Sequence, residues 1–470
     1  MTTKILNIIF GLLMCGSLSG CSRRIIKNAT LVPEISPLNT QIELRVTSDT
    51  SSSIYEGIIR KRLVSTFYRD TNGSPVWIKE NKLSHEGDSI INFLNQLDYY
   101  GLPRDRYHVK EIESYHDDIS ETTLIRTDVL LTDAFLAVTH DIGFGLQAVP
   151  SSGSDSIAVD LLRNAIADGH VKKWLEWQEP KSVGYRSLKR ALKNVLDFSS
   201  GDTAADADEI PSVFKVICAD LERWRNESVE FNGQYLFINI PSYMLYLVND
   251  SDTLLTSRVI VGNVASPTPE LNSIIECFTI YPYWHVPRKI AIEEYLSIIQ
   301  QDTSFISRNN FDVLDRKGGI LNPANIEWKK STKNYFPISL RQREGPENAL
   351  GVIKFHFDNP YAVYLHDTNS KRLFRIKDRA LSHGCIRVEK AEDLAHFLAT
   401  GRLGEKSNVV KKKLNEKKQS VINAAKPLPI YIRYFTTEVI NGHLIVYKDV
   451  YGKDERLLNI LFPSKTKSSF

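Results

Sequence analysis

The stretch SHGCIR, at residues 382–387, is the most informative part of this chain, and His366 lies upstream of it. A cysteine attacks a carbonyl carbon only as the thiolate, and near neutral pH it stays mostly protonated unless an imidazole or a cation lies close by. His366, His383 and Arg387 can supply such groups to Cys385. The stretch therefore predicts a cysteine nucleophile that transfers an acyl group through a thioester.

A metal site is one alternative, because His366, Asp367, His383 and Cys385 all carry atoms that can bind a metal ion. The stretch lacks the Cys-x-x-Cys or His-x-x-x-His spacing that is usual for zinc sites. We therefore predict no metal and no other cofactor.

A structural role is the other alternative, because burial is the commonest fate of a lone cysteine. After residue 21 the chain has three cysteines, the other two being Cys218 and Cys277. A single disulfide would leave one thiol over, and we assign that thiol to Cys385.

Three further blocks accompany the cysteine stretch: YPYWHVP at 281–287, GPENALG at 345–351 and YLHDT at 364–368. Together the four blocks resemble the signature of the L,D-transpeptidases, the YkuD-type cysteine enzymes that remodel bacterial peptidoglycan. The resemblance is to the large, multidomain members of the family. It covers about residues 230–400 and implies a mostly β catalytic domain.

His366 and His383 both compete for the role of the base that accepts the Cys385 proton. Residues two apart along a strand point the same way, so His383 cannot easily place its ring on the sulfur of Cys385. This geometry favours His366, and the resemblance implies the same role for the upstream histidine. His383 would then help to shape the oxyanion region.

The remaining site residues surround this pair. Gly384 permits a tight bend whose N–H groups can stabilise an oxyanion, and Ser382 is expected to hold the bend by hydrogen bonding. Arg387 is a fixed cation suited to a substrate carboxylate or to the thiolate. By resemblance Trp284 and Tyr364 line the substrate cleft, although each is equally typical of a core aromatic.

The first 21 residues predict export. Lys4 precedes an apolar run from Ile5 to Met14, and LSGC follows at residues 18–21. This is the pattern of a secretory signal with a lipobox, so Cys21 is the expected lipidated N-terminus and a lipid bilayer the expected anchor. The apolar run is too short to span a bilayer. Ser22 favours the outer membrane of a Gram-negative bacterium, facing the periplasm.

The 470 residues are too many for one ordinary domain, and we predict an α+β protein. The expected parts are a signal at 1–21, a linker at 22–50, a helical scaffold at 51–225, the catalytic domain at 230–400 and a C-terminal helix and β extension at 401–470. Residues 286–340 are a possible capping insertion over the site, or an ordinary surface insertion. The small peptidoglycan-binding module of many large members is expected to be missing between residues 200 and 211.

Periodicity places the elements. Apolar stripes at helical spacing predict scaffold helices around 90–97, 132–138 and 188–196. Alternation predicts strands over 236–240, 245–247, 259–261, 352–357 and 361–365. Helices are expected at 290–299, 391–399 and 411–418, and a hairpin-like pair of strands at 428–434 and 444–451 around Asn441–Gly442.

The formal net charge is only +3, with no basic run long enough to suggest a nucleic-acid partner. The resemblance implies peptidoglycan stem peptides as substrates: a tetrapeptide donor whose D-alanine leaves and an amine acceptor that gives a 3→3 cross-link. Carbapenems typically acylate such enzymes. If water resolves the thioester, the enzyme is an L,D-carboxypeptidase. A non-catalytic lipoprotein that binds peptidoglycan is the alternative from another class, and the oligomeric state is not indicated.

Overall fold

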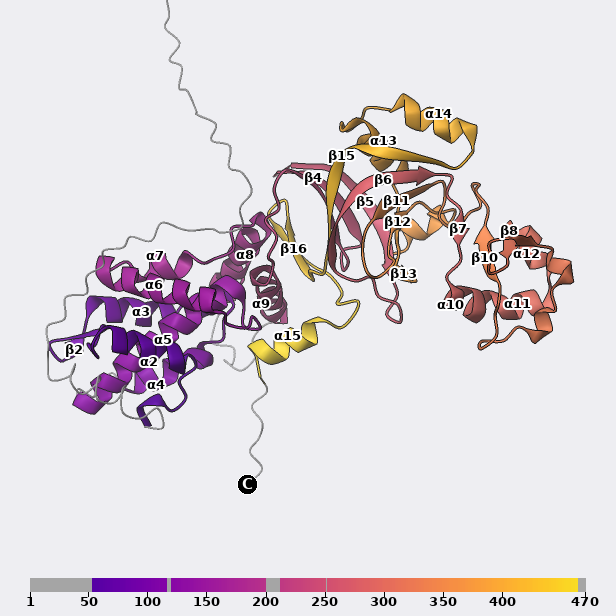
Figure 1. Ribbon diagram of the computed structural model, residues 1–470. Helices are drawn as coiled ribbons and strands as arrows, with labels where there is room; N and C mark the ends of the chain where they lie inside the picture. Colours follow the sequence, from indigo (N-terminus) through magenta and orange to yellow (C-terminus); the bar gives the residue numbers. More distant parts are fainter. Residues whose placement is uncertain (1–52, 116–119, 200–211, 251, 464–470) are drawn as a thin grey trace, which may run out of the picture. The chain divides into compact units, whose positions relative to one another are not determined.

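The computed structural model describes residues 53–115, 120–199, 212–250 and 252–463 (Figure 1). The expectations for the signal, Cys21, the linker and the stretch 200–211 lie outside these residues. The described residues form two compact units. One comprises 53–91, 110–139 and 150–177, and the other comprises 92–109, 140–149 and 178–463. Of the helices within this part of the chain, none combines the length and apolarity that crossing a bilayer requires.

The predicted helical region is helical. The helices are α2 (Lys61–Asp70), α3 (His85–Leu94), α4 (Val109–Ser114), α5 (Glu121–Phe144), α6 (Ser152–Asp168), α7 (Val171–Glu176), α8 (Val183–Ser199) and α9 (Ser212–Arg225), with a short hairpin of β1 (Ile78–Lys79) and β2 (Lys82–Leu83). The stripes that predicted them are buried, with Ile90, Phe135 and Leu192 fully enclosed. Local chemistry sets the ends of α6, because Ser151 and Ser154 form a reciprocal capping box and Gly169 ends the helix at φ 71°.

A closed ring of strands forms the centre of the second unit. Among the described residues the ring runs β5-β14-β12-β11-β6-β15-β3-β4 and returns to β5. Its members are β3 (Gln234–Asn239), β4 (Met244–Asn249), β5 (Asp252–Gly262), β6 (Leu271–Ile280), β11 (Ile353–Phe357), β12 (Leu365–His366), β14 (Ile386–Val388) and β15 (Ser420–Arg433). The short strand β13 (Ala380–Ser382) adds to β5.

Alternation decides which side chains fill the ring. Leu236, Ile238, Leu245 and Val259, which predicted the strands, are completely buried in one apolar core together with residues of α13 (Ala391–Thr400). The amphipathic helix expected at 411–418 is α14 (Asn408–Glu416), which buries Val410. With the helical region before the ring, these observations confirm the α+β class.

Two strand predictions were wrong. Residues 361–364 are not a strand, because β12 consists of Leu365–His366 alone. Residues 428–434 do not pair with 444–451. Instead 420–433 is β15, an internal strand between β6 and β3, and the hairpin at Asn441–Gly442 joins β16 (Thr437–Ile440) to β17 (His443–Val446). The turn at Asn441–Gly442 was predicted correctly. The strands that pair with residues 420–433 are distant in sequence, so the local pattern could not identify them.

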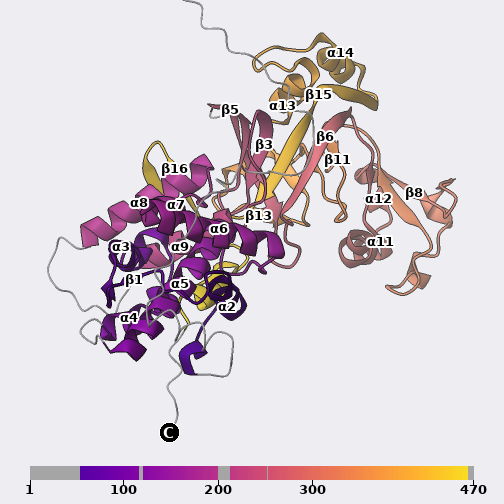
Figure 2. The same ribbon diagram turned by 60° about the vertical axis from the view of Figure 1, so that its left-hand side comes forward.

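The segment expected to be an insertion is an ordered lobe, visible beside the ring in both Figure 1 and Figure 2. A helix runs from Arg288 to Gln301 through α10, a π turn and α11, and α12 (Ser304–Arg308) follows. A four-stranded sheet has the order β7-β10-β8-β9, made of β7 (Trp284–His285), β10 (Ser339–Gln342), β8 (Phe311–Leu314) and β9 (Ile320–Leu321). The stretch after residue 300 therefore contains a short helix and three strands of this sheet.

A buried ion network joins α9 to α15 (Asp454–Leu461). Arg223 lies 2.5 Å from Asp220 and 2.6 Å from Asp454. Asp220 also accepts hydrogen bonds from the N–H and hydroxyl of Thr437 at 2.5 and 2.6 Å. The Asp220 and Asp454 carboxylates each have the opposite charge of Arg223 and at least one hydrogen-bond donor, which is what makes burial of such groups tolerable.

Replacing Asp454 with alanine should lower the free energy of unfolding by about 2–4 kcal/mol, because Arg223 and the Thr436 hydroxyl lose a buried acceptor. Glu455 is the next residue of the same helix and is exposed, so Glu455→Ala should change that free energy by no more than about 0.5 kcal/mol. Urea unfolding followed by circular dichroism measures both. Equal losses for the two variants would contradict a role for the network.

Candidate active site

Three neighbouring strands bring the predicted residues to one face. His366 of β12 pairs with Arg387 of β14 in a parallel ladder and with Lys354 of β11 in an antiparallel one. Directly paired residues share a face, and so do residues two apart along a strand. Cys385 and Tyr364 therefore lie on the same side as this row. The five side chains come from a surface only three strands wide.

The loop that carries Cys385 is fixed by main-chain geometry. Gly384 is buried and has φ 109°, a conformation that L side chains rarely adopt. Ser382 accepts a hydrogen bond from the Gly384 N–H at 3.2 Å and donates one to the Cys385 carbonyl at 2.6 Å. The Thr268 hydroxyl donates to the Gly384 carbonyl at 2.7 Å. The loop therefore positions the sulfur before any substrate arrives.

His366 is 5% exposed, and its Nδ1 lies 2.5 Å from the carbonyl oxygen of Asp367. A carbonyl can only accept, so we assign the proton to Nδ1, which leaves Nε2 with the lone pair; the main chain of Leu350 also hydrogen-bonds to the ring. Burial, followed by the nearby charges of Arg387 and Lys354, lowers the pKa of His366 to about 3. The ring is therefore neutral at physiological pH and its tautomer is that of a base.

Asp367 orients the histidine through its main chain. Its carboxylate accepts from the Val352 N–H at 3.1 Å and pairs with Lys371. Asp367 is 5% exposed, so it is a buried residue of the site and not an exposed aspartate at a strand end. Gly351, with φ 61°, makes this possible, because a Cβ there would lie 2.4 Å from the Asp367 carboxylate.

Opposing effects act on the Cys385 thiol. Burial raises its pKa above the ordinary value, while Tyr364, Lys354 and Arg387 stabilise the thiolate and oppose that rise. The Sγ atom also lies 4.0 Å from the Ala362 carbonyl. Since desolvation outweighs the favourable charges, the resting thiol is the main form, and a base or a change of environment is needed to ionise it.

His383 points to a different partner. Its Nε2 lies 2.5 Å from Glu294, which belongs to the π turn Ala291–Tyr295 of the lobe, and both side chains are more than 40% exposed. The Arg387 Nε is buried and has no hydrogen-bond partner among the described residues. Tyr295, at the end of the same turn, interacts electrostatically with Arg387. The lobe thus contacts the site at two positions.

Burial, followed by the nearby Cys385, raises the pKa of Tyr364 strongly, while Trp284 opposes that rise. The ammonium of Lys354 lies 4.0 Å from the centroid of the Tyr364 ring. Trp284 is 8% exposed and belongs to the apolar core of the lobe. Tyr364 therefore lies beside Cys385, whereas Trp284 is part of the apolar core against which Tyr364 packs.

The possible metal ligands do not converge. His366 binds a main-chain carbonyl, Asp367 binds Val352 and Lys371, and His383 binds Glu294. In the described part of the chain no group of three or more such side chains could hold a metal ion. Cys218, Cys277 and Cys385 are all free thiols, so the possible disulfide between the first two is not formed.

Sequence analysis did not identify three residues of the site: Lys354, Thr268 and Glu294. A signal for Lys354 was present, since β11 alternates apolar and polar residues and a single turn connects it to the strand that carries His366. Its register with His366 had to be seen in the structure. Thr268 and Glu294 lie on segments with no pattern that ties them to Cys385.

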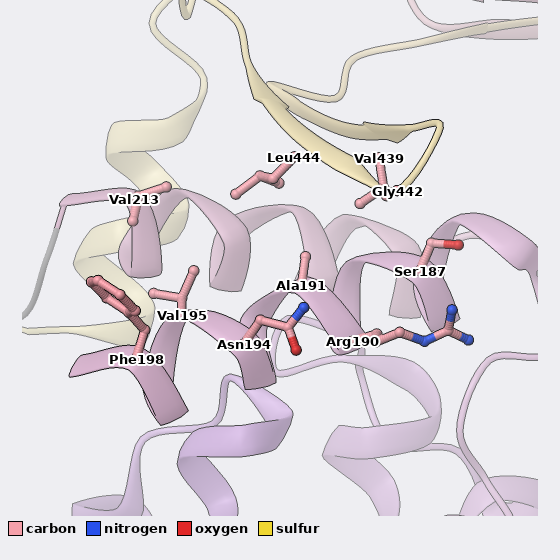
Figure 3. Close-up of a pocket in the computed structure, with 10 residues that line it drawn as sticks. All are labelled: Ser187, Arg190, Ala191, Asn194, Val195, Phe198, Val213, Val439, Gly442 and Leu444. Atoms are coloured by element: carbon pink, nitrogen blue, oxygen red, sulfur yellow. The ribbon is translucent and has the colours of Figure 1, made fainter. Parts of the chain in front are cut away.

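A groove of about 640 Å³ lies elsewhere on the second unit (Figure 3). It is formed by α8, α9 and the β16–β17 hairpin, and is lined by Ser187, Arg190, Ala191, Asn194, Val195, Phe198, Val213, Val439, Gly442 and Leu444. It shares no residue with the cysteine loop and contains no nucleophile with a base.

The fold and the cysteine loop define a class. A family model described as the L,D-transpeptidase catalytic domain, YkuD, matches residues 233–410. A second, described as a scaffold domain, matches residues 62–192. A protein of Haemophilus influenzae named "Putative L,D-transpeptidase" is 31% identical over 344 residues, which cover 70% of this chain and 67% of that protein. The chain belongs to the L,D-transpeptidase family, as a member that carries a scaffold domain, and this membership supports L,D-transpeptidase activity.

The lowered pKa of His366 makes stability depend on pH. The unfolded chain binds a proton at this residue below about pH 6.5, whereas the folded protein does so only near pH 3. Stability from burying the neutral ring is therefore complete above 6.5 and is lost as the pH falls towards 3.

His366→Asn keeps an N–H donor for the Asp367 carbonyl but cannot be protonated. Between pH 6.5 and 4 the wild type should lose stability faster than this variant, by up to about 1.4 kcal/mol per pH unit. Urea unfolding at a series of pH values measures the difference. His443→Asn, at an exposed position, is the control, and parallel curves for wild type and His366→Asn would refute the assignment.

Proposed function

We propose that this protein is a peptidoglycan L,D-transpeptidase that makes 3→3 cross-links between stem peptides through a thioester on Cys385. The observation that carries the proposal is the shared face of Cys385, Tyr364 and His366, with His366 neutral and its Nδ1 proton held by Asp367. A neutral imidazole with a free Nε2 is the form that can accept a thiol proton.

In the first half-reaction the Cys385 sulfur attacks the carbonyl carbon of the third stem residue, and its proton passes to His366. The Gly384 N–H is already bound to Ser382, so we assign the oxyanion to the N–H of Cys385. The C–N bond to D-alanine then breaks, the amine leaves with the proton from His366, and the thioester remains.

In the second half-reaction an amine of another stem attacks the thioester carbonyl. His366 accepts a proton from this amine and returns it to the departing sulfur, so the free thiol and a new amide are formed. Arg387, whose buried Nε has no partner among the described residues, suits either a substrate carboxylate or the thiolate. His383, held by Glu294 at the exposed rim, is assigned to shaping the entrance and not to proton transfer.

The proposal is tested with a disaccharide-tetrapeptide and excess D-methionine, followed by mass spectrometry. We expect terminal D-alanine to be replaced by D-methionine, and Cys385→Ala to reduce this exchange at least about 10³-fold, since the covalent route is lost. Cys277→Ala is the matched control, because Cys277 is also a free thiol but lies on β6. Tripeptide as the sole product would show a carboxypeptidase instead, and no product from any variant would contradict the proposed activity.

We also propose that Cys21 anchors the protein to a membrane of the cell envelope, on the strength of the lipobox pattern at residues 18–21. Labelling cells with a radioactive fatty acid should mark the wild type and not Cys21→Ala. Equal labelling of both would refute the anchor.

A further inference from the structure

Lys354 is a cation in an unusual place. It is partly buried on β11, in direct register with His366, and its ammonium lies over the ring of Tyr364. Among the described residues no carboxylate forms an ion pair with it. Burial of an ammonium without an opposite charge is costly, and here it lowers the pKa of Lys354. A charge kept in such a position calls for a functional explanation.

Cys385 lies on the same face of the sheet as Lys354, on the loop that leads into β14. The one favourable charge that acts on Lys354 is that of the Cys385 thiolate, and Lys354 in turn lowers the pKa of the thiol. Lys354 also disfavours the protonated form of His366. Both effects favour the same state of the site, a thiolate next to a neutral imidazole.

The other charged groups around Cys385 differ from Lys354 in their positions and partners. On β14, Arg387 lies on the opposite side of His366 and interacts with Tyr295 of the lobe as well as with the thiolate. Glu294 is the carboxylate that the lobe presents to this loop, and it is paired with His383. Lys354 and Arg387 therefore flank β12 as two cations that form no ion pair with a carboxylate of the described residues.

We propose that Lys354 is a positioning residue of the transpeptidase reaction, acting as the cation that stabilises the Cys385 thiolate when it forms beside His366. The role rests on the proposed function in that Cys385 is taken as the nucleophile. Lys354 takes part in no bond making or breaking. It raises the minor fraction of resting protein in which the thiol has lost its proton to solvent and His366 is neutral; in the rest of the protein His366 takes that proton as the sulfur attacks.

The test measures the thiol directly, without a peptidoglycan substrate. The protein is treated with iodoacetamide, a neutral reagent, from pH 6 to 11.5, and the mass of the peptide that carries Cys385 gives its alkylation rate. In Lys354→Met the pH midpoint should move up by about one unit, which is about a tenfold slower rate near pH 7. Lys354→Arg keeps the cation and should restore most of the rate. Lys426→Met, at an exposed position of β15, should behave as the wild type.

Iodoacetate, which is anionic, separates this role from that of a docking site for a substrate carboxylate. A thiolate counter-ion predicts that Lys354→Met shifts the midpoint with both reagents. If only the iodoacetate rate falls and the KM for the tetrapeptide rises, Lys354 binds a carboxylate and the proposal is overturned. An unchanged midpoint in a variant with the wild-type circular dichroism spectrum also overturns it.

The alkylation result stands apart from the proposed function. A shifted midpoint together with no D-methionine exchange by the wild type would uphold Lys354 as the counter-ion and remove the transpeptidase. Normal D-methionine exchange by the wild type, together with an unshifted midpoint in Lys354→Met, would uphold the transpeptidase and remove Lys354 as the counter-ion.

Discussion

The active site depends on the parallel pairing of β12 with β14. The Ile386 N–H donates to the Tyr364 carbonyl at 3.0 Å, and this one bond sets Cys385 beside Tyr364 and Arg387 beside His366. Because side chains alternate along a strand, a shift of one residue would send either the sulfur or the imidazole into the apolar core. Leu365 and Ile386, completely buried between the reactive positions, oppose such a shift. Core packing thus fixes the register on which the chemistry relies.

Much of the site could be predicted from sequence, because its residues lie in short motifs. Cys385, Ser382 and Gly384 are neighbours in one stretch, and the argument that residues two apart share a direction already favoured His366 over His383. The structure adds a reason, since His383 is engaged by Glu294 at the rim. Lys354 was missed because its role appears only when β11 is set opposite β12.

The same distinction between local and long-range information applies to the fold. Helices such as α5 and α8 and strands such as β11 were predicted, because each shows its period within a few residues. The partners of β15 could not be, since Ile430 pairs with Leu236 almost 200 positions earlier. The lobe was recognised as an insertion, but its sheet joins β7 to β10 across more than fifty residues and leaves no local pattern. Sequence predicts elements well where the deciding contacts are local, and poorly where they are not.

The position of β15 also determines when, during synthesis of the chain, the ring of strands can close. Until residues 420–433 have been synthesised, β3 and β6 are both exposed strand edges, and the ring of strands cannot close. Such edges readily pair with other chains. The matched catalytic region, which ends at residue 410, therefore lacks the strand that closes the ring. During translation Cys385 would leave the ribosome before the ring of strands is complete. Folding of the ring therefore depends on residues 420–433.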